Sequence, residues 1–375
     1  MNDAEYDLLI RAGRIVCPAT RIDGPGAVGI RSQKIVTAGA DISGTARQTL
    51  DFPQSMLLPG FIDLHAHPAE KGSKYGVDPD VHFLTRGVTT VLSQGDAGAL
   101  NWPDYQRTTV DGSRTRVRLA INLSAPGESM PGGCLEQLEW ADVDACVNAI
   151  ERAGEDIWGI AVNVSRVACG SNDPRELVRR ARIVAERTGR PLLYGVREPK
   201  DWPFDDQLAQ LKPGDVLTYC FRYAGWSIID GTDVHPAVRD ARERGVLFDV
   251  GHGMASFDFP TAEAAIAADF PPDTISTDQY ARHIGSNPQH DLPRTMSKLL
   301  AAGMPESDVF AAVTVRPASI LGLDSETGAL APGMCADLTV LNYNDAAAPL
   351  VDTNGNTRGG GCWEPVCTVR AGAVV

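Results

Sequence analysis

The chain has 375 residues, of which 43% are hydrophobic and 22% charged, a composition typical of a globular protein that can bury a sizeable core. Its formal net charge of −14 argues against nucleic acid and anionic membrane surfaces as partners, because both are bound through lysine and arginine. The acidic N-terminus lacks the sections of a signal peptide, and no apolar run is long enough to span a bilayer. We therefore expect a cytoplasmic protein with a small-molecule substrate.

Short alternating segments at both ends of the chain predict a small β domain. Between residues 6 and 50 these segments are separated by glycine and proline, and the last fifty residues follow the same pattern. We expect residues 1–56 and 325–375 to build one β-sandwich together. The chain leaves this domain and later returns to it.

Residues 57–324 show a different rhythm, in which β-rich runs alternate with helical patterns. A helix is predicted after Asp173, because an N-cap residue and a proline in the first turn precede an apolar stripe. Eight strands with helices between them predict an α/β fold of the (β/α)8 TIM barrel type, whose chemistry lies at the C-terminal strand ends. The eight runs are 60–65, 88–92, 116–123, 157–164, 191–196, 215–221, 246–250 and 273–277.

The first run of this barrel ends in two histidines, His65 and His67. Side chains two positions apart on a strand project to the same face, so both imidazoles can bind one metal ion at the barrel mouth. The alternative is a pair of hydrogen-bonded histidines in a loop.

The eighth run ends in a carboxylate, Asp278. Closure of a barrel makes the eighth strand a neighbour of the first, so Asp278 is expected to face the histidine pair. There it would act as a third metal ligand or as a general base. A lone aspartate after a strand can also be a helix N-cap.

Five sequence motifs lie at residues 59–67, 86–91, 248–253, 275–278 and 328–338. Together they resemble the amidohydrolase superfamily, and more closely its branch of deacetylases and dihydroorotase-like enzymes. The resemblance covers nearly the whole chain and is more specific for the fold than for the substrate.

This resemblance implies a metal site, but with half of its usual ligands missing. The family's binuclear site uses the His-x-His pair and the last-strand aspartate for one metal, a carboxylated lysine as a bridge, and two further histidines for the second metal. Here Ala161 falls at the lysine position, and Gly195 and Tyr219 fall at the histidine positions. We expect one Zn²⁺ ion, with water as the fourth ligand, and loss of the second site. Iron(II) suits the same ligands, but nothing else in the sequence indicates oxygen chemistry.

Four further residues are candidates for the vacated half and for substrate contact. Arg197 is expected to replace the second cation and Arg222 to bind a substrate carboxylate, unless both form structural ion pairs. Tyr219 would donate a hydrogen bond to a substrate oxygen or would only fill volume. His252, between two glycines, is a candidate for substrate contact and proton transfer, with a structural role as the alternative.

The favoured hypothesis is a hydrolase that cleaves an amide or cyclic amide C–N bond with one metal-activated water, with Asp278 as the proton acceptor. The first rival is a lyase, decarboxylase or isomerase on the same barrel, in which Tyr219, His252 or Asp278 moves protons. The second rival is a catalytically inactive homologue that serves as a partner subunit. Barrels of this kind resemble proteins that often self-associate, so a homo-oligomer is a further expectation.

Overall fold

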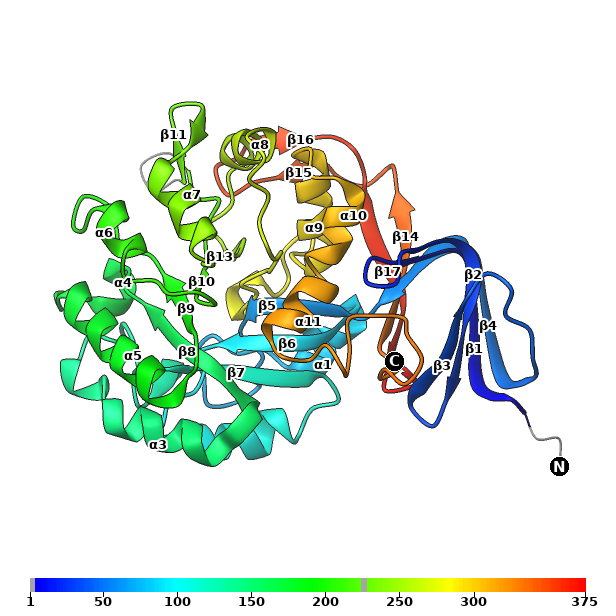
Figure 1. Cartoon of the computed structure of the whole chain (residues 1–375), viewed down its shortest axis with the longest axis horizontal. Helices are drawn as coiled ribbons and strands as arrows, with labels where there is room; N and C mark the ends of the chain where they lie inside the picture. The colour runs from blue at the N-terminus through cyan, green and yellow to red at the C-terminus, as the bar shows by residue number, and fades with distance from the viewer. Residues whose placement is uncertain (1–3, 224–227) are drawn as a thin grey trace.

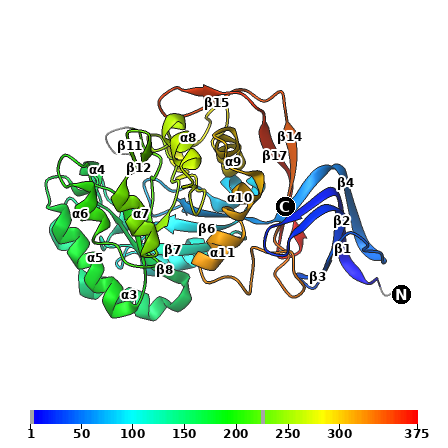
Figure 2. The same cartoon turned by 45° about the horizontal axis from the view of Figure 1, so that its top comes forward.

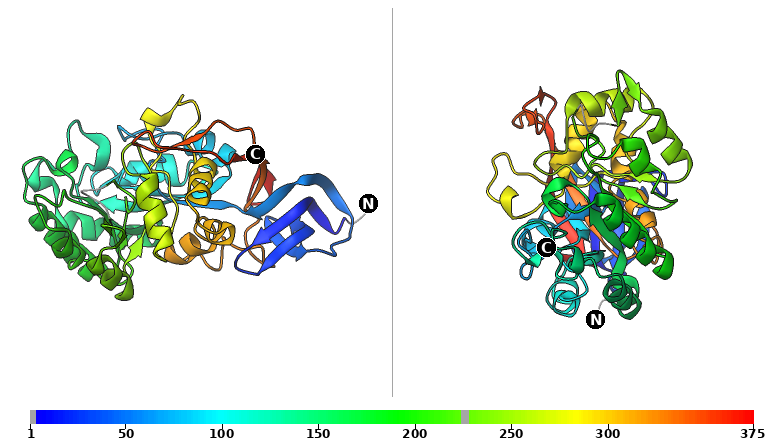
Figure 3. Two further views of the ribbon diagram at one scale, coloured as in Figure 1. Left: turned by 90° about the horizontal axis from the view of Figure 1, so that it is seen from above. Right: turned by 90° about the vertical axis from the view of Figure 1, so that its left-hand side faces the viewer.

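The computed structural model describes residues 4–223 and 228–375. It consists of a curved parallel sheet surrounded by helices and a mixed β-sheet that extends to one side (Figure 1). The molecule is elongated, and the mixed sheet forms one of its ends (Figure 3).

The barrel is built on seven parallel strands that are hydrogen-bonded in the order β13-β10-β9-β8-β7-β6-β5. They correspond to the first seven predicted runs and confirm the predicted fold class. The strands are β5 (Phe61–Ala66), β6 (Val88–Gln94), β7 (Arg116–Asn122), β8 (Ile157–Asn163), β9 (Leu192–Gly195), β10 (Val216–Leu217) and β13 (Leu247–Phe248).

Residues 273–277, the eighth predicted run, and Asp278 after them complete the ring without forming a regular strand. On one side, the backbone N–H of Val250 donates to the carbonyl of Thr274 at 3.2 Å. On the other side, the N–H of Asp278 donates to the carbonyl of His65 at 2.6 Å. The end of this segment therefore lies against the end of β5, as closure of a barrel requires.

The predicted helix after Asp173 is the longest one, α5, and its limits follow from the sequence. The Asp173 carboxylate accepts a hydrogen bond from the N–H of Arg175, Pro174 occupies the first turn, and Gly189 ends the helix with a φ of +67°. No helix in the described ranges is long and apolar enough to cross a membrane. The helices are α1 (Pro79–His82), α2 (Trp102–Tyr105), α3 (Val143–Ala153), α4 (Arg166–Cys169), α5 (Pro174–Thr188), α6 (Phe204–Leu208), α7 (Pro236–Glu243), α8 (Phe259–Ala267), α9 (Leu292–Ala301), α10 (Glu306–Ala311) and α11 (Val315–Ile320).

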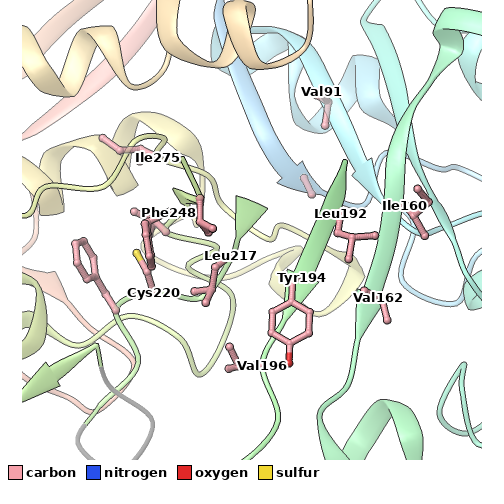
Figure 4. Close-up of a cluster of buried hydrophobic side chains, with 14 of the residues drawn as sticks. Val91, Ile160, Val162, Leu192, Tyr194, Val196, Leu217, Cys220, Phe248 and Ile275 are labelled. Atoms are coloured by element: carbon pink, nitrogen blue, oxygen red, sulfur yellow. The ribbon is translucent and has the colours of Figure 1, made fainter. Parts of the chain in front are cut away.

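The barrel strands divide their apolar side chains between two clusters. Ile160, Leu192 and Leu217 belong to the larger cluster, which includes helix residues (Figure 4). Ala161 and Leu193, each one position further along the strand, belong to a smaller cluster with residues of α11. Because neighbours on a strand point to opposite faces, position 161 faces the interior of the barrel.

Both termini contribute to the mixed sheet, as predicted, and its strand order is β18-β17-β14-β4-β1-β2-β3. The sheet bends around its own core: Ile30 and Ile35 share a buried cluster with Leu338 and Val369. The N–H of Ile35 also donates to the carbonyl of Met334 at 2.9 Å, which connects the outer edge of the sheet to the segment before β14. The strands are β1 (Tyr6–Cys17), β2 (Ile22–Arg31), β3 (Lys34–Gly39), β4 (Ala46–Pro59), β14 (Leu338–Asn344), β17 (Cys362–Arg370) and β18 (Ala373–Val374).

Two small hairpins complete the structure, β11 (Ile229–Asp230) with β12 (Asp233–Val234), and β15 (Leu350–Val351) with β16 (Thr357–Arg358). The second hairpin reaches from the mixed sheet across the barrel and lies beside α8 (Figure 2). There the carboxylate of Asp352 accepts a hydrogen bond at 2.8 Å from the N–H of Phe259, in the first turn of α8.

A buried carboxylate also connects the barrel to the mixed sheet. Asp337 is 2% exposed and accepts hydrogen bonds from Arg116 of β7 at 3.0 Å and from Arg370 of β17 at 2.9 Å. Burial would raise the pKa of Asp337, but the two guanidinium groups outweigh burial and lower this pKa below its usual value.

We predict that Asp337→Ala lowers the free energy of unfolding at pH 7 by about 3 kcal/mol, because two partly buried arginines lose their buried partner. The folded-state pKa is depressed, so this contribution is present above the unfolded pKa of about 3.9 and is lost as the pH falls through the folded value. Urea unfolding at pH 7 measures the change. The control is Asp51→Ala, which removes an exposed pair with Arg11 and should cost less than about 0.5 kcal/mol. Equal losses in the two variants would contradict the prediction.

Candidate metal centre

Three side chains meet at the C-terminal end of the barrel: His65 of β5, His67 just beyond it, and Asp278. The Oδ1 atom of Asp278 lies 3.5 Å from Nε2 of His65 and 3.4 Å from Nε2 of His67. One potential ligand atom from each residue lies within 4.8 Å of the other two. The structure thus brings together the three residues predicted as metal ligands.

Hydrogen bonds fix the orientation of the His67 imidazole. Its Nδ1 lies 3.0 Å from Oδ1 of Asp96, a fully buried carboxylate that also accepts bonds from Ser73 and Ser93, both at 2.6 Å. Because a carboxylate only accepts, Nδ1 must carry the proton in neutral His67. The lone pair of Nε2 then points toward the centre, the arrangement in which a metal-binding histidine is held by a carboxylate.

His65 is oriented by a hydroxyl and a second buried carboxylate. Its Nδ1 lies 2.7 Å from Oγ1 of Thr218, and this hydroxyl donates to Oδ2 of Asp249 at 2.8 Å. Since the hydroxyl proton goes to Asp249, the hydroxyl oxygen accepts from Nδ1–H of His65. Nε2 of His65 is again the atom left to bind a metal.

The distances within this centre fit one ion. A tetrahedral zinc ion with bonds of about 2.0–2.1 Å holds its nitrogen and oxygen ligands about 3.3 Å apart. The two nitrogen–oxygen distances, 3.4 and 3.5 Å, are close to this spacing. Two imidazoles and one carboxylate leave one position for water or substrate, as in catalytic zinc sites.

The charges around the centre also favour a cation. Burial opposes protonation of His65, but the attraction of Asp278 and Asp249 outweighs it and raises the pKa of His65 to about 9. Burial likewise opposes protonation of His67, and Asp96 and Asp278 raise its pKa to about 10. Although burial would raise the pKa of Asp278, the two imidazoles hold it well below the usual range.

The positions that the family resemblance assigns to a second metal carry residues that are not metal ligands. Ala161 faces the barrel interior from β8. A Cβ atom added to Gly195 would lie 2.9 Å from Cγ of Asn163, so the Asn163 side chain occupies the space beside this glycine. Within residues 4–223 and 228–375, the only cluster of three His, Cys, Asp or Glu side chains with metal-binding spacing is the one formed by His65, His67 and Asp278.

Tyr219 turns its phenol toward the ligands. Its hydroxyl lies 3.4 Å from Nε2 of His65, and its backbone adopts a left-handed φ of +67°. Burial, reinforced by the negative charge of Asp278, raises the pKa of Tyr219 well above its usual value. The phenol therefore keeps its proton and can donate a hydrogen bond.

Two adjoining cavities open beside the centre, with volumes of about 210 and 370 Å³. His67 and Tyr75 line the smaller cavity, and Arg222 and Ser256 line the larger one. A substrate whose reacting bond lies at the centre can therefore extend in two directions. The residues common to both cavities are Asn163, Ser165, Val167, Tyr219, Asp278 and Tyr280.

The two candidate arginines have different surroundings. Arg222 lines the larger cavity, donates from Nε to Oγ of Ser256 at 3.0 Å, and stacks over Tyr219 with its guanidinium carbon 4.5 Å from the ring centre. Arg197 instead donates from Nε to Oδ2 of Asp201 at 3.0 Å. Arg197 therefore forms the structural ion pair given above as the alternative, and does not replace the second cation.

His252 lies behind the centre and not in the cavities, which corrects the expectation that it contacts substrate. Its Nδ1 donates to the carbonyl of Gly253 at 2.8 Å, and its Nε2 lies 2.7 Å from Nζ of Lys298. The side chain is 3% exposed and stacks on Phe257. The glycines on either side of it lie close to the side chains of Thr218 and Asp278.

Sequence reasoning missed Asp96, Thr218 and Asp249. The two aspartates each follow a buried strand at the face where barrel enzymes carry their chemistry, and this position could have indicated a role at the site. No sequence feature indicated a role for Thr218, because the role of a hydroxyl depends on which groups the fold brings close to it.

The comparisons with known proteins establish the family. The model of the amidohydrolase family matches residues 241–366. A protein named a deacetylase from Agrobacterium fabrum is 35% identical over 329 residues, which cover 86% of this chain and 79% of the relative. Another protein named a deacetylase, from Enterococcus faecalis, is 33% identical over 94% of both chains. The chain therefore belongs to the amidohydrolase family, and the predicted resemblance is confirmed.

Solved structures agree with this assignment. The chain superposes with a TM-score of 0.88 and 31% identity on the crystal structure of an adenine deaminase, over 99% of this chain and 100% of the other. It superposes equally well, at 31% identity, on a dihydroorotase over 98% of both chains. These relatives carry names that refer to different substrates, so the comparisons define the family and the fold.

We predict that metal affinity falls as the pH is lowered from 8 to 6. In the metal-free protein the pKa values of His65 and His67, about 9 and 10, lie above this range, so a metal must displace protons from both rings. The dissociation constant for Zn²⁺ should rise about tenfold or more for each unit by which the pH is lowered. Competition titration with a chelator at several pH values measures it. A pH-independent constant would show that the rings are already neutral.

Proposed function

We propose that the protein is a hydrolase that cleaves an amide or cyclic amide C–N bond with a single zinc ion bound by His65, His67 and Asp278. The convergence of two Nε2 atoms on one carboxylate oxygen, at 3.4 and 3.5 Å, carries this proposal. The nature of the residues at positions 161, 195 and 219 supports one ion instead of two. The relatives named deacetylases support an acylated substrate.

Zinc at this position would lower the pKa of a water molecule and polarise a substrate carbonyl. The protein supplies the proton acceptor: the Asp278 carboxylate is ionised and lies 3.5 Å from Nε2 of His65. It would accept a proton from the attacking water and return it to the departing nitrogen.

Tyr219 and Arg222 complete the proposed site. The protonated phenol of Tyr219, close to His65, donates to the carbonyl oxygen as negative charge develops there, a role that the second ion has in binuclear sites. Arg222 in the larger cavity favours a substrate that carries a carboxylate, because a guanidinium binds this group with two parallel hydrogen bonds.

We predict that the purified protein binds one equivalent of zinc and hydrolyses N-acyl amino acids or cyclic ureides. His65→Ala should lose both the ion and turnover, because one of three ligands is removed. His82→Ala, on the partly exposed helix α1, is the matched control and should keep both. Metal analysis and a substrate screen measure the outcome. Bound zinc without hydrolysis would favour the lyase, decarboxylase or isomerase, and absence of metal in the wild type would favour the inactive homologue.

We predict that Tyr219→Phe lowers kcat by about 100-fold and leaves zinc content unchanged, because the variant loses a hydrogen-bond donor used mainly in the transition state. Arg222→Met should instead raise KM for a substrate with a carboxylate, with a smaller effect on a neutral analogue. Steady-state kinetics of both variants tests the two roles. If Tyr219→Phe retains the kcat of the wild type, the phenol only fills volume.

A further inference from the structure

A lysine is buried behind the metal centre. Lys298 belongs to α9 and is 5% exposed, and its Nζ lies 2.7 Å from Nε2 of His252. Burial, reinforced by repulsion from Arg294, lowers the pKa of Lys298 to about 7. Lysine side chains near a helix end ordinarily extend to water, so keeping this one inside lowers the stability of the fold. A buried apolar side chain here would avoid this loss.

His252 is held from two sides by this lysine and by its own turn. Its Nδ1 donates to the carbonyl of Gly253, so its Nε2 is an acceptor and Lys298 is the matching donor. The imidazole lies nearly parallel to the ring of Phe257, at a centroid distance of 4.9 Å and an angle of 11°. Lys298 thereby stabilises the tautomer that the Gly253 carbonyl selects and helps to hold the orientation of the His252 ring.

The turn that carries His252 lies directly against the metal centre. A Cβ atom on Gly253 would lie 2.4 Å from Oδ2 of Asp278, and one on Gly251 would lie 2.2 Å from Oγ1 of Thr218. The two glycines also have left-handed φ values of +47° and +49°. The turn therefore contacts both the ligand carboxylate and the hydroxyl that orients His65.

We propose that Lys298 is a positioning residue for the metal centre: through His252 it holds the turn at residues 251–253 against Asp278 and Thr218, and so keeps the ligands at metal-binding spacing. This inference rests on the proposed single-metal function. Asp278 needs such support, because its left-handed φ of +46° is unfavourable for a residue other than glycine.

Titration of the metal-free protein with Co²⁺ tests the proposal. Lys298→Met removes the donor and His252→Phe keeps the stacked ring without its nitrogens, so both variants should raise the dissociation constant about 10- to 100-fold. The double variant should bind no more weakly than the weaker single variant, because the two residues act through the same contact. The visible absorption of bound Co²⁺, which reports coordination geometry, should change in all three.

Ser297→Ala on the same helix is the control. Its hydroxyl accepts from the N–H of Trp363 in the mixed sheet, so its loss should lower stability in urea and leave Co²⁺ affinity and absorption unchanged. Wild-type affinity and absorption in Lys298→Met and His252→Phe would overturn the proposal, as would additive losses in the double variant. If the wild type binds no Co²⁺, both the single-metal function and the positioning role are wrong. If the wild type binds Co²⁺ and the variants bind it equally well, only the positioning role is wrong.

Discussion

Two buried carboxylates attach the last segment of the barrel to its neighbours, and the arrangement of the centre depends on them. Oδ2 of Asp249 accepts from the hydroxyl of Ser276 at 2.6 Å, and Asp63 accepts from the hydroxyl and the N–H of Thr277 at 2.5 and 3.1 Å. Burial raises the pKa of Asp63 to about 7 despite these bonds. Because residues 273–278 form no regular strand, these side-chain bonds supplement the few backbone bonds of the ring. Asp278 is the next residue, so its approach to the histidines follows from this attachment.

The buried carboxylates also determine the electrostatics of the centre. Asp249 holds the last segment and also accepts a hydrogen bond from the Thr218 hydroxyl, which orients His65. Asp96 orients His67 directly, through a hydrogen bond to its Nδ1. Together with Asp278 these carboxylates surround two buried imidazoles with negative charge, and charges interact strongly where they are shielded from solvent. This negative charge raises the pKa values of both rings, so the rings hold protons when no ion is bound. A divalent cation supplies the same positive charge and satisfies the same carboxylates, so the surroundings that favour protonation also favour metal binding.

The sequence allowed prediction of the elements whose determinants are local. The first seven strands, α5 with its cap at Asp173, and the meeting of His65 and His67 with Asp278 follow from periodicity, capping and barrel closure. The surroundings of His252 and Arg197 did not, because each depends on a partner distant in sequence or on a loop. His252 bonds to Lys298, 46 residues away, and no periodic pattern marks that lysine as different from others on a helix surface. Such pairings become visible only when the packing is known.

The backbone conformation at the centre helps to distinguish a site adapted to one ion from a binuclear site that has lost its second set of ligands by decay. Among the described non-glycine residues with positive φ, Tyr219 and Asp278 are the two that line the cavities at the centre. Left-handed backbone at such residues persists only where the surroundings enforce it, and it concentrates at functional sites. Decay would be expected to relax these conformations. Instead both left-handed conformations are present, the Tyr219 phenol reaches His65, and Asn163 lies against Gly195. The strained backbone supports the proposed one-ion site over a binuclear site in decline.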